Sequence, residues 1–478
     1  MKDWEKFVRV IIWVTVASLY ASPLPAQQEG GEKAKPAARE YPPLLNTSED
    51  QQDTDQGTQP MQPDSQPLSG IENPTLGTPE MRHSYWIPGI EYSNNAKSNS
   101  LNPMLNYGWN TTSFLSGDVS LLEAWSHSLL SANYSGGGFF STDPTLGNGQ
   151  YHQLAAAYEI DQRRWQLLFV DQFSYLPQST FGFGGASGLA FPGIMGTLAV
   201  PLPGLQSTFV PSQTILTTNG SRYSNASAVQ LTYAVSPRGS ITLAGVYGTL
   251  HFVDSGNLDS DTDILNAGYS YALTRKDTVG VAYRFSAFHY PGDPQALGDH
   301  VGQFAYGRKI TGRLALKLAG GPEVTTFRVA IGGSTQKIAG SGNAALTYAF
   351  ARGSIALTYV HGVSGGSGVF TGSNTDQANA TVTRRLTRVW NGTVNFGYSK
   401  NRQILSVSGV SSPTYDTWLA GAGLSRALGR TANFSLAYQA QIQGGNVAIC
   451  NNPTCGTDYT VHEVFATFQW HTRPLVLR

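Results

Sequence analysis

The chain has 478 residues, and its 31 Lys and Arg residues balance its 31 Asp and Glu residues, which gives a formal net charge of +0. A chain without a basic excess lacks the electrostatic footprint of a nucleic-acid-binding protein, so we expect no nucleic-acid partner. Hydrophobic residues make up 40% of the sequence, but they are dispersed: no segment after the N-terminus holds the roughly 20 consecutive apolar residues that a transmembrane helix needs.

The first 83 residues differ in composition from the rest. Residues 1–26 combine a short basic start, an apolar run at residues 10–21 and the small residue Ala26 before a predicted cleavage point, which is typical of a secretory signal peptide. Residues 27–83 are rich in Gln, Pro, Asp and Ser and nearly lack aromatic residues. Such a segment buries too little apolar surface to offset its chain entropy, so we predict that it is disordered.

Residues 84–478 are predicted to form strands that have one apolar face and one small or polar face. The plainest unit is a hairpin at residues 263–290. Leu265, Tyr269 and Tyr271 alternate with small or polar residues on its first arm, and Val281 and Tyr283 do so on its return arm. Since successive side chains of a strand point to opposite faces, each arm has one face suited to an apolar medium and one suited to water.

Tight polar turns recur roughly every 40 residues and alternate with longer connections. They lie near residues 123–126, 161–163, 236–239, 274–277, 309–312, 351–353, 386–388 and 427–430. The arms between them are about 10 to 13 residues long, which lets a tilted strand cross a bilayer. Eight turns and two terminal strands predict an all-β fold, an antiparallel transmembrane β-barrel of about 18 strands, or 16 if the first pair does not form. An even count places both ends, and residues 27–83, in the periplasm.

The third of the longer connections, residues 176–221, has no regular alternation. It is dense in Gly, Pro and Phe, and no Asp, Glu, Lys or Arg occurs between Asp171 and Arg222. Loops of this length are usually functional or disordered. Disorder normally accompanies charge and low hydrophobicity, which this loop lacks, so we expect it to pack against another surface.

These features resemble those of bacterial outer-membrane porins: a signal peptide, an even number of membrane-length strands, short inner turns and a long third loop. The resemblance implies a channel for passive or weakly selective diffusion of small solutes, in which the third loop folds inward and sets the bore. It also suggests a homotrimer. The candidate residues of an apolar constriction are Phe181, Phe183, Phe191 and Phe209. Unlike a typical porin constriction loop, this loop has no acidic residue, which argues against simple ion sieving.

Polar residues on the strand face that carries small or polar side chains are expected to face the lumen, because a charge facing lipid at mid-depth costs about 2 to 4 kcal/mol. The candidates are Arg284, Lys317, Gln439 and Gln441. Many other basic residues lie at the inner turns. Outer-membrane lipid is therefore an expected partner, through the phosphates of its inner leaflet, although a positive inner mouth that attracts anions is the alternative.

Two loop features suggest further chemistry. Carboxylates alternate at Asp254, Asp259, Asp261 and Asp263, and oxygen donors of this kind bind calcium, although a solvated acidic loop explains the same pattern. Cys450 and Cys455 are the two cysteines of the chain, and an oxidising compartment favours a disulfide between them.

The sequence has no HExxH and no phosphate-binding loop, so we predict neither an enzyme nor a cofactor. The alternatives are a barrel-wall hydrolase of lipids or peptides, whose Ser and His would meet only in the fold, and a structural or adhesive barrel.

Overall fold

A computed structural model describes residues 84–98, 108–143, 147–176, 221–253, 258–329, 333–365, 370–404, 413–446 and 459–476. The chain divides into two units, residues 1–40 and 41–478, and all described residues belong to the second. The predicted signal peptide and disordered segment, residues 1–26 and 27–83, lie outside the described residues. None of the described residues belongs to a helix that has the length and apolar character to cross a membrane.

Every element of the described chain is a β-strand. The strands are β1 (Tyr85–Ser98), β2 (Trp109–Ala124), β3 (Ser128–Ser141), β4 (Gly149–Asp161), β5 (Trp165–Leu176), β6 (Arg222–Ala234), β7 (Gly239–Phe252), β8 (Ser260–Ala272), β9 (Asp277–His289), β10 (Ala296–Lys309), β11 (Leu314–Val329), β12 (Gly333–Phe350), β13 (Gly353–Ser364), β14 (Ser373–Arg385), β15 (Trp390–Gln403), β16 (Thr414–Ala427), β17 (Ala432–Asn446), β18 (Tyr459–His471) and β19 (Leu475–Val476).

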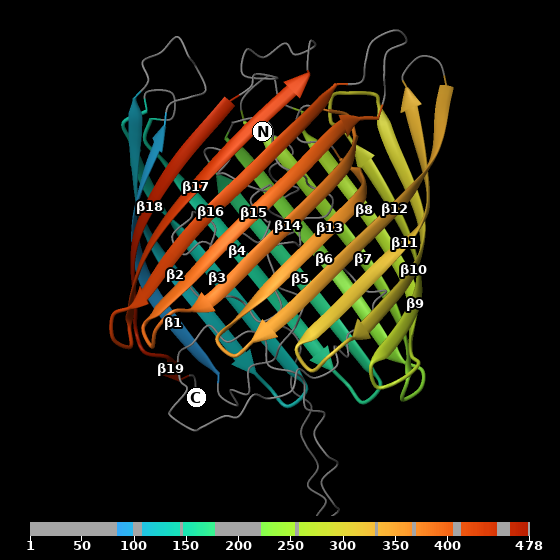
Figure 1. Cartoon of the computed structure of the whole chain (residues 1–478), viewed down its shortest axis with the longest axis horizontal. Coiled ribbons are helices and arrows are strands. Elements are labelled where there is room, and N and C mark those ends of the chain that lie inside the picture. Colours follow the sequence, from blue (N-terminus) through green and yellow to red (C-terminus); the bar gives the residue numbers. More distant parts are fainter. Residues whose placement is uncertain are drawn as a thin grey trace, which may run out of the picture. The chain divides into compact units, whose positions relative to one another are not determined.

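Each strand from β1 to β18 pairs antiparallel with its neighbours in chain order, and β18 pairs with β1 from Gly89↔His471 to Lys97↔Glu463, which closes the sheet. The strands run obliquely, so that β13–β18 in orange and red cross over β3–β8 in teal and green (Figure 1). The described part of the chain therefore confirms the predicted 18-stranded antiparallel barrel. The short β19, which pairs with Tyr85 and Trp86, was not predicted.

The two ends of the barrel have different connections. The turns that follow β2, β4, β6 and every later even strand up to β16 are short, as between Ala234 and Gly239. Longer connections join the other ends, except between β11 and β12, where only residues 330–332 intervene, and the longest runs from Leu176 to Arg222. This asymmetry is the one that the sequence predicts, and the strand ends agree with the predicted loop 176–221.

The alternation of exposure along each strand separates the outer wall from the inner wall. On β17 the exposed large apolar side chains are Phe434, Leu436, Tyr438 and Ile442, whereas Ser435, between them, is only 3% exposed. Because a closed barrel shields its concave side, the exposed apolar phase is the outer wall and the buried phase is the inner wall. An outer wall of large apolar side chains and an inner wall rich in polar groups are what a membrane-spanning barrel requires.

Tyrosines on the outer wall form a repeated pattern of hydrogen bonds towards the end with the longer connections. Each of five hydroxyls bonds a His or Asp on the next strand, as Tyr438 does with His462 Nδ1 at 2.7 Å. The other four couples are Tyr134–His152, Tyr283–His300, Tyr359–Asp376 and Tyr398–Asp416, at 2.6 to 2.8 Å. Amphipathic rings of this kind concentrate at membrane–water interfaces. These couples therefore mark the level at which the outer membrane–water interface meets the barrel.

We expect Tyr438→Phe to lower the free energy of unfolding by about 0.5 to 1.5 kcal/mol, because it removes the hydroxyl that bonds His462. Tyr233→Phe is the matched control, since Tyr233 is also exposed on the outer wall and its hydroxyl bonds no described residue. Urea titration of the folded barrel in lipid vesicles measures both. Equal effects of the two changes would show that the couple contributes nothing to stability.

One carboxylate interrupts the apolar outer wall. Asp171 lies on the outward phase of β5, between Phe169 and Phe173. Its Oδ1 accepts hydrogen bonds from Ser227 Oγ at 2.5 Å and Asn225 Nδ2 at 3.3 Å. These two bonds reduce the cost of holding a charge on the wall that faces lipid.

Candidate functional site: the inner wall

Much of the inner wall of β4–β8 is apolar, although the buried polar residues Gln153, Glu159 and Arg222 lie on the same strands. Its apolar cluster is formed by the buried residues Ala157, Leu168, Val170, Ala226, Ala228 and Val246, all at most 9% exposed, and the partly buried Ile264 packs against them. All of them occupy the phase opposite to outward residues such as Phe169 and Val229. An apolar patch on the inside of a barrel gains stability when other apolar groups cover it.

The inner wall of β9–β11 is charged. Arg284 Nη2 lies 4.0 Å from Asp299 Oδ2, and Thr325 Oγ1 donates to Asp299 Oδ1 at 3.2 Å. On the next strand Glu323 accepts a hydrogen bond from the backbone N–H of Val363 at 3.2 Å. Both carboxylates are 0% exposed, so one guanidinium and two acids form a compact group on the wall.

A second charged group lies where the barrel closes. Glu463 on β18 is 3% exposed, and its Oε1 lies 3.9 Å from Lys97 Nζ and accepts a hydrogen bond from Asn95 Nδ2 at 3.4 Å. On the same inner face, Glu91 of β1 and Asp118 of β2 are a further pair of acids, and Asp118 is 5% exposed. The seam from β18 to β2 is therefore the more acidic side of the inner wall.

The inner wall of β15–β17 carries no charge and is mostly polar, although Tyr415, Leu419 and Ala437 are also buried on these strands. We call it the amide wall and define it by Asn395, Ser399, Asn401, Thr417, Gln439, Gln441 and Gln443, which are all at most 5% exposed. No inward position of these three strands, in the described parts of the chain, carries a charged residue. The apolar patch is centred on β6, and the amide wall begins nine strands later, at β15. In a ring of 18 strands the two surfaces therefore lie on opposite sides.

The four predicted lumen residues all lie on the inward phase, but they differ in exposure. The Arg284 side chain is 27% exposed, and Lys317 lies opposite Gly307 and Ala345. Gln439 and Gln441 are 0% and 5% exposed. Both amides are therefore buried on the inner wall, and their contact with water in the lumen stays a prediction.

Several predicted site residues lie outside the described residues. These are Phe181, Phe183, Phe191, Phe209, Asp254, Cys450 and Cys455. Of the other carboxylates of the predicted calcium site, Asp259 accepts a hydrogen bond from the backbone N–H of Phe252 at 2.8 Å and contacts His251. The described residues include no group of three His, Cys, Asp or Glu side chains in a metal-binding arrangement. With Asp254 outside the described chain, the calcium site stays a prediction.

Sequence reasoning missed the acids Asp299, Glu323 and Glu463 as parts of the inner wall. The alternation along the strands could have placed such acids on the inner wall. Glu323, for example, occupies the same strand phase as Lys317, which was predicted to face the lumen. What strand phase does not give is the pairing across strands. The sequence therefore could have shown an inward charge at each position, but not that Asp299 and Glu323 share Arg284.

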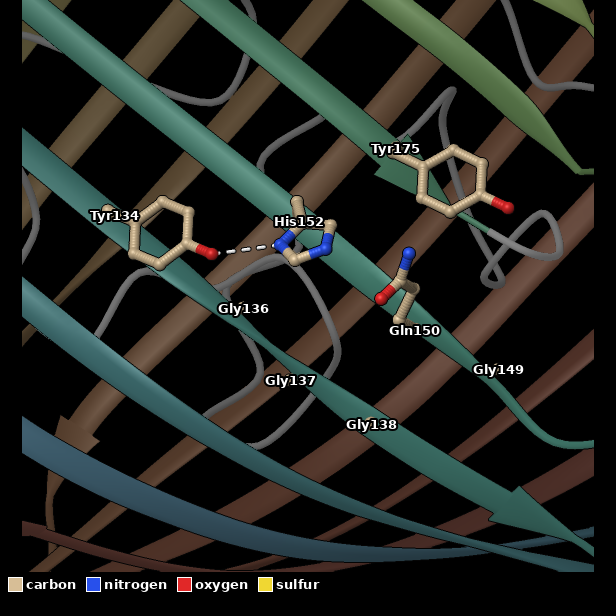
Figure 2. A pocket seen from close by; sticks show the side chains of 8 residues that line it. All are labelled: Tyr134, Gly136, Gly137, Gly138, Gly149, Gln150, His152 and Tyr175. Carbon is tan, nitrogen blue, oxygen red and sulfur yellow. Dashed lines mark hydrogen bonds between the residues drawn. The ribbon is translucent and has the colours of Figure 1, made fainter.

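A depression of about 590 Å³ opens on the outside of the barrel rather than in the lumen. Tyr134, His152 and Tyr175 border it, and glycines at positions such as 136 and 138 form its floor (Figure 2). A side chain at Gly136 would overlap the Tyr134 hydroxyl and the His152 ring. Because its lining belongs to the wall that faces lipid, the depression is not part of a solute path.

Comparisons with known proteins find structural likeness only. No family model and no curated protein matches the chain. Solved structures with a similar fold include the outer membrane protein OpdK of Pseudomonas aeruginosa, at 9% identity and a TM-score of 0.41, over 81% of this chain and 99% of that one. OccK2 (OpdF) of Pseudomonas aeruginosa matches at 8% identity and a TM-score of 0.41, over 81% of this chain and 98% of that one.

OccAB1 of Acinetobacter baumannii matches at 9% identity and a TM-score of 0.41, over 85% of this chain and 100% of that one. Values this low assign neither a family nor a solute. The conclusion therefore rests on the geometry of the chain itself. An even, closed antiparallel barrel, short turns at one end, an apolar outer wall and a polar inner wall are the architecture of a bacterial outer-membrane β-barrel.

Proposed function

We propose that the protein is an outer-membrane channel through which small solutes diffuse passively or with weak selectivity. The observation that carries the proposal is the inner wall, which presents charged, amide and hydroxyl groups over most of its circumference inside a closed barrel. Barrels of 16 to 18 strands leave an aqueous channel unless something fills it. Polar groups on the inner wall are needed for a water-filled path and serve no purpose in contact with lipid.

We further propose that the loop 176–221 folds into the lumen and narrows the bore. The loop leaves the barrel at Leu176 and returns at Arg222, beside the apolar patch of β4–β8. An uncharged loop rich in Phe, Leu, Val and Pro has the composition to cover that patch. Exposing the same loop on the cell surface would leave a large apolar area in water.

The first test is the conductance of the purified protein in planar bilayers. Stepwise current is the expected result. If the protein carries no current and cleaves lipids or peptides, the channel proposal is wrong and the alternative function, a barrel-wall hydrolase, takes its place.

The second test replaces residues 181–203 with a short Gly/Ser linker. We expect a marked rise in unit conductance with the oligomer intact, because the apolar constriction, including Phe181, Phe183 and Phe191, is removed. The control replaces residues 405–410, in the connection between β15 and β16, with Gly and Ser. Unchanged conductance together with dissociation into monomers would instead assign the loop to contacts within the expected homotrimer.

A further inference from the structure

The barrel wall is not paired over its full height. Starting from the short turn, β12 pairs with β13 only as far as Gly342↔His361. Residues 333–341 of β12 therefore have no described strand beside them on that side, although on the other side they pair with β11 throughout. A closed barrel normally leaves no strand edge, so this free edge requires an explanation.

The free edge presents backbone donors and acceptors. The Ala349 N–H donates to the Arg313 carbonyl at 2.8 Å, on the β11 side of β12. Because every second residue of a strand bonds the same neighbour, the odd-numbered residues of β12 bond β11 and the even-numbered ones face away from it. The even-numbered residues beyond Gly342 are Ser334, Gln336, Ile338 and Gly340. Each directs its N–H and its C=O to the side that no described strand occupies.

β13 turns away from β12 at Val363. In the register of the two strands Val363 would lie opposite Gly340, but its backbone N–H donates to Glu323 Oε1 at 3.2 Å instead. Its side chain packs against the buried aromatic and leucine cluster of β9–β11, and the Gly365 carbonyl accepts a hydrogen bond from Tyr290 Oη at 2.9 Å. These contacts hold the end of β13 against the inner wall, so the free edge is built into the fold.

The free edge lies on the water side of the outer interface. Tyr359, whose hydroxyl bonds Asp376, belongs to the couples that mark this interface, and it lies opposite Ala344 of β12. Residues 333–341 lie beyond that level, towards the end with the longer connections. Residues 333–338 are all exposed, and Ile338 is 78% exposed. An accessible edge in water is a template on which another strand can pair.

Membrane geometry argues against a second copy in the same membrane as the occupant. Strands of such barrels are tilted by about 40°, so two upright barrels side by side bring their facing strands together at about 80°. Paired strands are rotated relative to one another by only about 20 to 25°. A peptide segment of a partner protein is free of this restriction, because it can align with the edge.

The charges of the β11–β12 hairpin select an acidic segment. Residues 324–341 contain Arg328 and Lys337 but no Asp or Glu, and both basic residues are exposed. Lys337 and Ile338 are successive residues, so they point to opposite faces of β12. A segment with carboxylates on one face and apolar side chains on the other would match both of them across the strand pair.

We propose that residues 333–341 are a docking edge for an extended, acidic segment of a partner protein on the side with the longer connections. The segment adds a strand to β12: its backbone bonds Gln336 and Ile338, and its carboxylates lie beside Lys337. This interaction goes beyond the proposed channel function and does not depend on it.

The first test measures binding of short fluorescent peptides to the purified barrel in lipid nanodiscs by anisotropy. The probe alternates Val and Glu. One comparison peptide alternates Val and Lys, and the other is the probe with N-methyl groups on consecutive residues, which blocks backbone donors on both of its edges. We expect the probe to bind about tenfold more tightly than either, since several hydrogen bonds or a charge pair are lost. Failure of the probe to bind, or equal binding of the N-methylated peptide, would overturn the proposal, and neither comparison needs a variant.

The second test removes one donor from the free edge. Gln336→Pro lacks the backbone N–H that faces the open side, and proline is tolerated at such an edge position. Gln336→Ala is the matched control, because it changes the same side chain and keeps the N–H. We expect Gln336→Pro to weaken binding of the Val/Glu peptide about tenfold and Gln336→Ala to leave it unchanged. Equal binding by the two variants would show that the peptide does not pair with this edge.

The third test reverses the charge. Lys337→Glu should shift the preference from the Val/Glu peptide to the Val/Lys peptide. The matched control is Arg275→Glu, which makes the same change in net charge at an exposed position of a short turn at the other end of the barrel. An equal shift in Arg275→Glu would mean that the peptides respond to net charge alone, which contradicts a docking edge at Lys337.

Self-association is tested on the same proteins by sedimentation. We expect the unmodified protein, Gln336→Pro and Gln336→Ala to sediment alike. A larger assembly that is lost only in Gln336→Pro would overturn the peptide site and assign the edge to pairing between copies. Folding of each variant is verified beforehand by the change in gel mobility between heated and unheated samples. A protein that conducts in planar bilayers but binds no acidic peptide remains a channel, so the two proposals fail separately.

Discussion

Leu436→Arg should destabilise the barrel by about 2 to 4 kcal/mol, because it places a charge in contact with acyl chains at mid-depth. Leu436 is 46% exposed on the outer wall, between Phe434 and Tyr438. The variant should also assemble poorly in the membrane. The yield of folded barrel and urea titration in lipid vesicles measure the two effects.

Val360→Arg is the matched control for this result. Val360 is 43% exposed, but it lies on the inward phase of β13, paired with Asn343 and Gln377. A charge at this position meets polar neighbours rather than lipid, so we expect little loss of stability. If Leu436→Arg and Val360→Arg are tolerated equally, the assignment of outer and inner walls is wrong, since lipid and water do not accept a charge at equal cost.

A second large effect is expected from Gly321→Ala on β11. A Cβ atom at this position would overlap the backbone carbonyl oxygen of Gly302 on β10. The two strands approach closely where the ladder between them lacks pairs, from Val301↔Glu323 to Phe304↔Gly320. Because backbone atoms must move, we expect a loss of about 1 to 3 kcal/mol in the free energy of unfolding.

The reciprocal change, Gly302→Ala, tests whether the effect is one of close approach rather than of glycine content. A Cβ atom at Gly302 meets no atom within 4 Å, so its effect should stay within about 0.5 kcal/mol. Both variants are compared by urea titration under the same conditions. A loss in Gly302→Ala that matches the loss in Gly321→Ala would exclude the overlap as the cause.

The fold was predictable because its two signals are local. Alternation along a strand needs only a few consecutive residues, and each tight turn lies within one short segment. The contacts that build the inner wall are not local: Asn95 and Glu463 bond across 368 positions of the chain, and their register depends on how the barrel closes. For the same reason the sequence showed that Tyr438 faces outward but not that it bonds His462.

The candidate site was predictable only in part. Strand phase places Gln439 and Lys317 on the inward side, but phase does not tell a side chain in open water from one that is buried. Burial depends on how the curved wall and its neighbours pack. The amide wall was missed because its residues come from three strands, and only their alignment makes them one surface.

The tyrosine couples also fix the thickness of membrane that the barrel suits. On the outward phase of β15, Trp390 lies at the end next to the short turn, and Tyr398, eight positions along, bonds Asp416. For a strand tilted by about 40°, this separation corresponds to an apolar height of about 20 Å. An apolar belt of this height is shorter than the hydrocarbon core of a thick bilayer. The bilayer must then thin around the protein, which costs free energy. The protein should therefore partition into vesicles of short-chain lipids in preference to long-chain ones, which agrees with the thinner bilayer of bacterial outer membranes.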